Sequence, residues 1–105
     1  MKDLIIGVDL GGTNVKTALV SRDKKILGKD SRPTRAAEGP GAVMDVMVES
    51  VDAVLKEAGA TRDNVLAAGF GAPGPMNWQT GIVFSPPNLP GWKDVPLAAE
   101  MTKRL

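Results

Sequence analysis

Residues 4–21 read LIIGVDLGGTNVKTALVS, which is two largely apolar stretches joined by a short turn with two glycines. The first stretch, residues 4–10, is rich in β-branched residues and predicts a mostly buried strand. The second stretch, residues 15–21, alternates in polarity, which predicts a strand with two different faces. This strand, turn and strand decide how the rest of the chain is arranged.

Two short turns connect the first three predicted strands. Residues 22–25 form a polar turn, and residues 26–31 predict a third, more exposed strand. Short turns between consecutive strands indicate an antiparallel meander. The period then changes, because apolar residues between 43 and 58 fall three or four apart and predict an amphipathic helix ending near Gly59. Residues 65–70 predict a buried strand that a right-handed crossover can place parallel to an earlier one.

The remaining segments are loops and one further helix. Residues 32–39 predict a polar loop before the first helix. Asp94 is the expected N-cap of a second helix, with Pro96 in its first turn. The predicted apolar face of this helix consists of Leu97, Met101 and Leu105. Because its pattern is still running at the last residue, we expect the chain to be a fragment.

The composition excludes several classes of protein. Hydrophobic residues make up 43% and charged residues 24%, as in an ordinary soluble domain. A net charge of +1 gives no electrostatic reason to expect binding to nucleic acid or a membrane surface. No apolar run has transmembrane length and no signal peptide is present, so a cytoplasmic protein is expected. The chain lacks Cys and His, which excludes a disulfide scaffold, a zinc site and a catalytic unit built on these residues within it.

The hairpin turn carries the first chemical motif. Asp9 lies near the end of a strand, and Gly11 and Gly12 are expected to turn the chain with positive φ. Such a turn brings bare backbone N–H groups up to an anion. The carboxylate of Asp9 is a candidate ligand of Mg²⁺, bound through water, because hard cations prefer oxygen ligands.

Three further side chains at this turn suit a phosphate group. The Thr13 hydroxyl and the Asn14 amide can donate to phosphate oxygens, and Lys16 adds positive charge if its strand face points that way. The alternative is a plain Gly-Gly hairpin turn, because short glycine motifs have many false positives. The turn lacks the Gly-Lys-Ser/Thr end of a P-loop, and no helix follows it as in a dinucleotide-binding fingerprint.

Two later loops are rich in glycine and proline. Residues 69–75, GFGAPGP, follow a predicted buried strand, and open α/β sheets bind ligands at such carboxyl ends. Residues 86–92, PPNLPGW, present Asn88, whose amide suits a sugar hydroxyl. Trp92 either stacks on a sugar or packs into the core under the loop. For the first loop, a purely structural role is the alternative.

Together and in this order, the three motifs resemble the N-terminal part of the ROK family of repressors, uncharacterised reading frames and sugar kinases. The turn at residues 9–13 resembles the first phosphate motif of actin-like ATPases, whereas residues 69–75 and 87–92 resemble ROK glucokinases. The resemblance covers nearly the whole chain. It implies a ribonuclease-H-like α/β lobe: a three-stranded antiparallel meander extended by parallel strands, with helices on both faces.

The resemblance also implies roles for the motif residues. Gly11, Gly12, Thr13 and Asn14 would lie near the β- and γ-phosphates of ATP, with Asp9 near Mg²⁺. Gly74 and its neighbours would line a hexose, most simply glucose. The residues expected at the sugar are Pro73, Gly74, Pro75 and Asn88.

Other parts of the family's catalytic machinery are not present in these residues. The family's general base is the Asp of an Asn-Asp pair, and no such pair occurs here. That base, the adenine pocket and a Cys-rich zinc motif are expected beyond Leu105. Residues 1–105 are therefore expected to be the N-terminal lobe of a sugar kinase, inactive alone and a possible homo-oligomer at full length.

Two other functions and two chemical details stay open. A sugar-responsive ROK regulator would carry a DNA-binding domain ahead of the phosphate motif; with a first strand predicted to start at Leu4, we expect no such domain. A non-catalytic module that binds a sugar or a nucleotide is the other alternative. The residues do not identify the hexose, and they do not distinguish ATP from polyphosphate as the phosphoryl donor.

Overall fold

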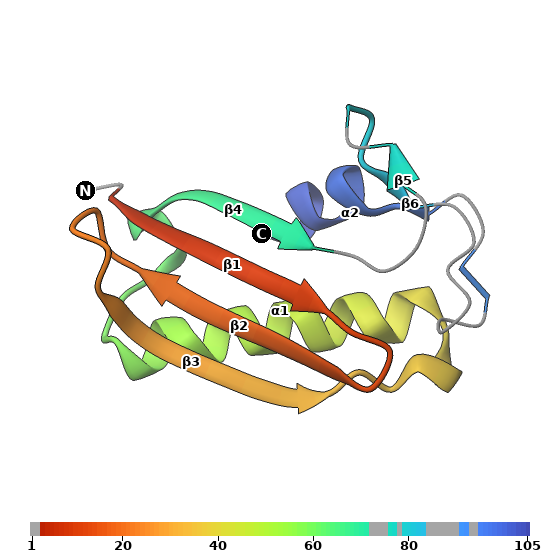
Figure 1. Cartoon of the computed structure of the whole chain (residues 1–105), viewed down its shortest axis with the longest axis horizontal. Helices are drawn as coiled ribbons and strands as arrows, with labels where there is room; N and C mark the ends of the chain where they lie inside the picture. The colour runs from red at the N-terminus through yellow and green to blue at the C-terminus, as the bar shows by residue number, and fades with distance from the viewer. Residues whose placement is uncertain (1–2, 72–75, 78, 84–90, 93–94) are drawn as a thin grey trace.

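The centre of the molecule is a four-stranded sheet with the strand order β3–β2–β1–β4 (Figure 1). The computed structural model describes residues 3–71, 76–77, 79–83, 91–92 and 95–105. β1 (Leu4–Leu10) pairs antiparallel with β2 (Asn14–Val20), and β2 pairs antiparallel with β3 (Ile26–Pro33). β4 (Val65–Gly71) lies parallel to β1 on the other side. The predicted meander, extended by a parallel strand, is confirmed. The expected burial of that strand is wrong, because every residue of β4 is exposed or half-buried among the described residues.

Side chains in β1 alternate between two environments. Ile6 and Val8 are 2% and 3% exposed, whereas Ile5 is 42% exposed. The strand was expected to be mostly buried, but only alternate residues are, because within the described residues one face of the sheet is covered and the other is open.

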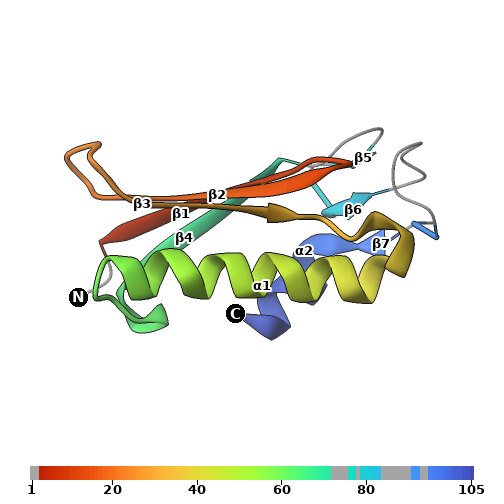
Figure 2. The same cartoon turned by 90° about the horizontal axis from the view of Figure 1, so that it is seen from below.

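The covered face packs against α1 (Pro40–Glu57), which lies along the sheet (Figure 2). Its apolar stripe fits the predicted period, and Gly59, just beyond the helix, has the expected left-handed conformation at φ +67°. β3 approaches α1 closely at Gly28. A Cβ added to Gly28 would lie 2.9 Å from the carbonyl oxygen of Val54, so this crossing depends on a residue without a side chain.

A small antiparallel sheet follows, with the strand order β5–β6–β7. Its strands are β5 (Met76–Asn77), β6 (Ile82–Val83) and β7 (Val95–Pro96), and α2 (Leu97–Arg104) comes directly after β7.

The start of α2 differs from the sequence prediction. Pro96 pairs with Ile82 in the small sheet and is the N-cap residue, so it does not lie in the first helical turn. The N-cap was expected at Asp94, which lies outside the described residues; pairing of β7 with β6 keeps residues 95–96 extended, and the helix begins at Leu97.

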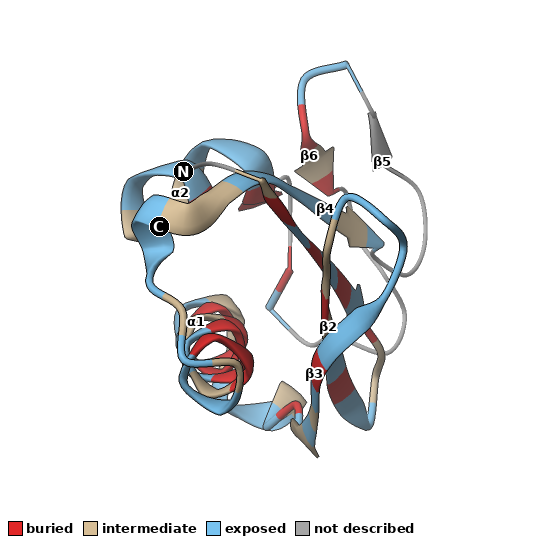
Figure 3. Cartoon of the chain, turned by 90° about the vertical axis from the view of Figure 1, so that its left-hand side faces the viewer, coloured by how far each residue is buried: buried red, intermediate tan, exposed pale blue. Residues whose placement is uncertain are grey.

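Both helices lie on the same side of the main sheet (Figures 2 and 3). Arg62, in the 3₁₀ turn η2 (Arg62–Asn64), donates two hydrogen bonds to Asp52 of α1, at 3.0 and 2.9 Å. It also donates to the carbonyl of Arg104 in α2, at 2.9 Å, and the Arg104 guanidinium pairs with Asp45 of α1. The resemblance implies helices on both faces; among the described residues the second face is open.

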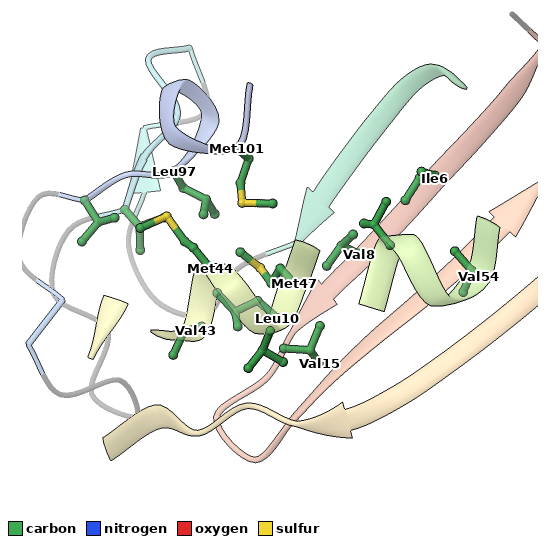
Figure 4. Close-up of a cluster of buried hydrophobic side chains, with 14 of the residues drawn as sticks. Ile6, Val8, Leu10, Val15, Val43, Met44, Met47, Val54, Leu97 and Met101 are labelled. Atoms are coloured by element: carbon green, nitrogen blue, oxygen red, sulfur yellow. The ribbon is translucent and has the colours of Figure 1, made fainter. Parts of the chain in front are cut away.

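The hydrophobic core lies between the covered face and the two helices. In Figure 4, side chains from β1, α1 and α2 meet there, including Val8, Met47 and Met101. Trp92 is 3% exposed and belongs to this core, which supports packing over sugar stacking for its indole. In the part of the chain that is described, no helix is both long and apolar enough to cross a membrane.

Candidate phosphate site

The turn between β1 and β2 is closed by a backbone hydrogen bond. The Gly11 N–H donates to the carbonyl of Asn14 at 3.0 Å. A Cβ added to Gly11 would lie 2.8 Å from that same oxygen, which is closer than Cβ atoms approach in proteins. Glycine is therefore required at position 11 because of this close approach. The expected positive φ at Gly11 and Gly12 is wrong, because the described glycines with positive φ are Gly39, Gly59, Gly81 and Gly91.

Thr34 holds this turn from the end of β3. Its side-chain hydroxyl donates to the carbonyl of Gly11 at 2.8 Å, and its backbone N–H donates to the carbonyl of Thr13 at 2.9 Å. Thr34 is fully buried. The sequence analysis missed it, because it lies in a segment predicted as a polar loop and its partner Gly11 is 23 residues away.

Three carbonyls of the turn accept hydrogen bonds from protein donors, whereas two of its amides are free among the described residues. The carbonyls of Gly11, Thr13 and Asn14 each accept one of the hydrogen bonds described above. Among the described residues, the backbone N–H groups of Gly12 and Thr13 donate to no acceptor. Gly12 is half-buried and Thr13 is exposed. Successive free N–H groups at a turn form a concave donor surface that suits an anion such as a phosphate.

Asp9 and Lys16 lie side by side at the edge of this turn. They are direct partners in the β1–β2 register and both are exposed on the open face. Within the described residues, the Asp9 carboxylate makes no hydrogen bond or ion pair. On its other side, Gly71 of β4 is its register partner, and a Cβ there would lie 3.9 Å from Asp9 Oδ1. Because side chains alternate between the two faces along each strand, Asp9 and Lys16 point to the same face of the sheet.

A hollow of about 790 Å³ occupies the open face beside these two residues. Gly7, Ala18 and Gly69 form one row of small residues across β2, β1 and β4, and they line the hollow. A Cβ at Gly7 or Gly69 would meet no atom within 4 Å. Residues 11–14 do not line the hollow. The residues predicted to bind phosphate thus form two groups. Asp9 and Lys16 lie on the open face of the sheet, and residues 11–14 lie in the turn at the end of the sheet.

A buried polar cluster joins β2 and β3 to α1. The Ser50 hydroxyl lies 2.7 Å from the Thr17 hydroxyl and 2.7 Å from Asp30 Oδ2. Arg32 Nε donates to the same carboxylate at 2.7 Å and pairs with Glu49 at 3.6 Å. The hydrogen bond from Arg32 lowers the pKa of Asp30, with the Ser50 hydroxyl acting in the same direction and burial opposing both. Ser50 interrupts the apolar stripe of α1, and a polar residue at such a position is the signal from which the sequence could have predicted this cluster.

The residues at the turn fit a magnesium-bound phosphate group. An exposed carboxylate with no protein partner in the described part of the chain is an oxygen ligand of the kind that Mg²⁺ prefers. No group of three or more His, Cys, Asp or Glu residues gathers among the described residues. Phosphate oxygens and water would then supply the other ligands, as is usual for Mg²⁺ at phosphate sites.

The predicted sugar-binding residues lie outside the described part of the chain. These are Pro73, Gly74, Pro75 and Asn88. The structure places only the strand that leads to the first of them, since β4 ends at Gly71, next to Asp9 in the sheet.

Comparison with known proteins identifies the family. A family model described as the ROK family matches residues 5–105. The chain belongs to the ROK family. Proteins similar to this chain include the glucokinase of Thermotoga maritima, which is 39% identical over 100 residues. A xylose repressor assigned provisionally in a Caldicellulosiruptor strain is 29% identical over 101 residues. The first alignment covers 95% of this chain and 30% of the glucokinase, and the second covers 96% and 25%.

Solved structures of sugar kinases superpose closely on the chain. The ROK hexokinase of Thermus thermophilus has a TM-score of 0.84 at 31% identity, over 96% of this chain and 32% of its own. A ROK glucokinase of Streptomyces griseus, in complex with glucose and AMPPNP, gives 0.82 at 27%, over 97% and 30%. An inorganic polyphosphate/ATP-glucomannokinase of an Arthrobacter strain gives 0.80 at 27%, over 98% and 41%. The fold is therefore the actin-like ATPase fold of ROK sugar kinases, and the chain spans about a third of these proteins' length.

Proposed function

We propose that this chain forms the phosphate-binding part of an ATP-dependent hexose kinase, with glucose as the substrate to test first. The observation that carries the proposal is the turn at residues 11–14, where protein donors occupy the carbonyls of Gly11, Thr13 and Asn14, and the amides of Gly12 and Thr13 are free among the described residues. The family relatives named as glucokinases support a sugar as the acceptor.

Each residue of the turn has a distinct role in this proposal. The free amides and the Thr13 hydroxyl donate to phosphate oxygens, and Lys16 offsets part of their negative charge. Asp9 would hold Mg²⁺ through water, and the cation would neutralise charge on the phosphates during transfer. Phosphoryl transfer depends on positioning and charge stabilisation from the groups around the transferred phosphate. The resemblance implies that the general base is the Asp of an Asn-Asp pair, and because no such pair occurs in these 105 residues, this chain alone is expected to be inactive.

The test is a phosphorylation assay on the full-length protein. Hexoses, with glucose first, are supplied with ATP and Mg²⁺, and formation of ADP and of the sugar phosphate is followed. A parallel series replaces ATP by polyphosphate, because one structural relative is named for using both donors. Sugar-dependent ADP formation that Asp9→Asn greatly reduces is the expected result. A protein that phosphorylates no hexose with either donor contradicts the proposal.

The second candidate function is transcriptional regulation, because some relatives are named as repressors. Xylose repressors match over most of this chain at 27–29% identity. A regulator would share the fold and the sugar site without needing a kinase activity. Binding of the full-length protein to DNA upstream of sugar-utilisation genes, released by a sugar, would favour this function over the first.

A further inference from the structure

We propose that Thr34 is a positioning residue for the nucleotide phosphates, acting through the turn at residues 11–14. This inference rests on the proposed function. Thr34 is fully buried and touches the turn twice, through its hydroxyl to Gly11 and through its backbone N–H to Thr13. It contacts neither the phosphates nor the cation itself. Its role is to decide which way the peptide groups of the turn face.

Planarity of the peptide bond connects the hydroxyl contact of Thr34 to the free amide of Gly12. All peptide bonds in the described residues are trans, so each carbonyl and the N–H of the next residue point in opposite directions. The carbonyl of Gly11 shares its peptide plane with the N–H of Gly12. Holding that carbonyl on the Thr34 hydroxyl therefore aims the Gly12 N–H away from Thr34. The Thr13 carbonyl shares its peptide plane with the N–H of Asn14. The hydrogen bond from the Thr34 N–H to that carbonyl therefore aims the Asn14 N–H away from Thr34 as well.

The orientation of the peptide plane between Gly11 and Gly12 determines whether this peptide group attracts or repels an anion. With the Gly11 carbonyl held inward, the partial positive charge of the Gly12 N–H faces the phosphate. If the plane rotates, the carbonyl oxygen turns toward the phosphate and attraction becomes repulsion. Glycine at positions 11 and 12 leaves the chain free to make this rotation, since it has no Cβ to restrict its backbone. The hydroxyl of Thr34 removes that freedom before the ligand arrives, which reduces the entropy cost of binding.

The buried threonine on β2 provides a matched control. Thr17 is 3% exposed and its hydroxyl bonds to Ser50 at 2.7 Å, on the side of the sheet that faces α1. Thr17→Val and Thr34→Val each remove one buried hydroxyl and keep the shape of the side chain. The two substitutions are therefore expected to lower the stability of the protein by similar amounts. Only Thr34→Val releases the turn at residues 11–14, called the phosphate turn below.

The experiment measures binding of AMPPNP with Mg²⁺ by calorimetry to the full-length wild-type protein and to the Thr34→Val, Thr34→Ser and Thr17→Val variants. Loss of one hydrogen bond that orients the turn predicts that Thr34→Val weakens binding about five- to tenfold. Thr34→Ser keeps the donor, so its affinity is expected within about twofold of the wild type. Glucose binding in the absence of nucleotide is expected to be unchanged in Thr34→Val. Thermal unfolding of each variant establishes that the proteins compared are folded.

Three outcomes would overturn the role of Thr34 while leaving the proposed function intact. They are unchanged AMPPNP affinity in Thr34→Val, equal losses in Thr34→Ser and Thr34→Val, and an equal loss in Thr17→Val. A wild-type protein that does not bind AMPPNP at all would instead contradict the proposed function, and the role of Thr34 with it. If Thr34→Val does not fold, Thr34→Ala compared with Thr34→Ser carries the same test, because only serine restores the donor.

Discussion

Replacement of Gly11 by alanine tests the geometry of the phosphate turn most directly. The new Cβ would lie 2.8 Å from the Asn14 carbonyl oxygen, and that oxygen accepts the hydrogen bond from the Gly11 N–H at 3.0 Å. The methyl group and the hydrogen bond therefore compete for the same oxygen. Because the clash is with backbone, no side-chain rotation relieves it.

The size of the effect follows from this overlap. An ordinary carbon–oxygen contact requires the turn to open by about 0.6 Å, which lengthens its closing hydrogen bond. Loss of one such bond costs about 1 kcal/mol, and strain from an added buried methyl group brings the range to about 1–3 kcal/mol. The opening also displaces the free amides of Gly12 and Thr13. We therefore expect AMPPNP affinity to fall roughly tenfold or more, since about 1.4 kcal/mol corresponds to a factor of ten.

Two measurements on the full-length protein separate stability from binding. Urea unfolding gives the free energy of unfolding of Gly11→Ala, and calorimetry gives its affinity for AMPPNP with Mg²⁺. Gly41→Ala serves as the control, because Gly41 is exposed in α1 and an added Cβ meets nothing within 4 Å. The control is expected to leave affinity unchanged and to raise stability by up to about 1 kcal/mol, since alanine favours a helix over glycine.

The reasoning about the turn would be refuted by a specific result. If Gly11→Ala unfolds at the same urea concentration as the wild type and binds AMPPNP equally well, the turn is not closed as described. If stability falls but affinity does not, the turn geometry holds and its role in phosphate binding is wrong.

Three further predictions concern the scaffold around the site. Gly28→Ala places a Cβ 2.9 Å from the Val54 carbonyl oxygen and is expected to lower the free energy of unfolding by about 1–3 kcal/mol, measured in urea; an unchanged midpoint would contradict the close approach of β3 to α1. Gly81→Ala combines φ +72° with a Cβ 2.2 Å from that of Ala98, so a loss of about 2 kcal/mol or more is expected in the same assay, and a smaller loss would argue against the contact of this turn with α2. The pKa of Asp30 is lowered in the folded protein, so its stabilising effect is present above about pH 4 and is lost as pH falls further. Urea midpoints of Asp30→Asn and of the wild type should therefore converge below about pH 4, and a constant difference down to pH 2 would contradict this assignment.

Local sequence patterns predicted most of the main sheet. The bounds of the first strand, the meander, the long helix and the parallel strand follow from periodicity and turn length, which depend on near neighbours in the chain. The start of the second helix was wrong because Pro96 pairs with Ile82, and that pairing is a contact between distant residues. The reason for glycine at position 11 was also wrong, since close approach to the Asn14 carbonyl sets it and not positive φ.

The sequence by itself determined the succession of strands along the chain, the position of the turn at residues 11–14 and the resemblance to the ROK family. Only the tertiary structure showed that Thr34 holds the turn, that Ser50 joins a buried cluster with Thr17 and Asp30, and that Lys16 shares a face with Asp9. The physical reason is the distance along the chain over which each property is decided. Strand and helix patterns depend on residues only a few positions apart in the chain. A hydrogen bond between residues 34 and 11, in contrast, exists only after β3 has paired with β2.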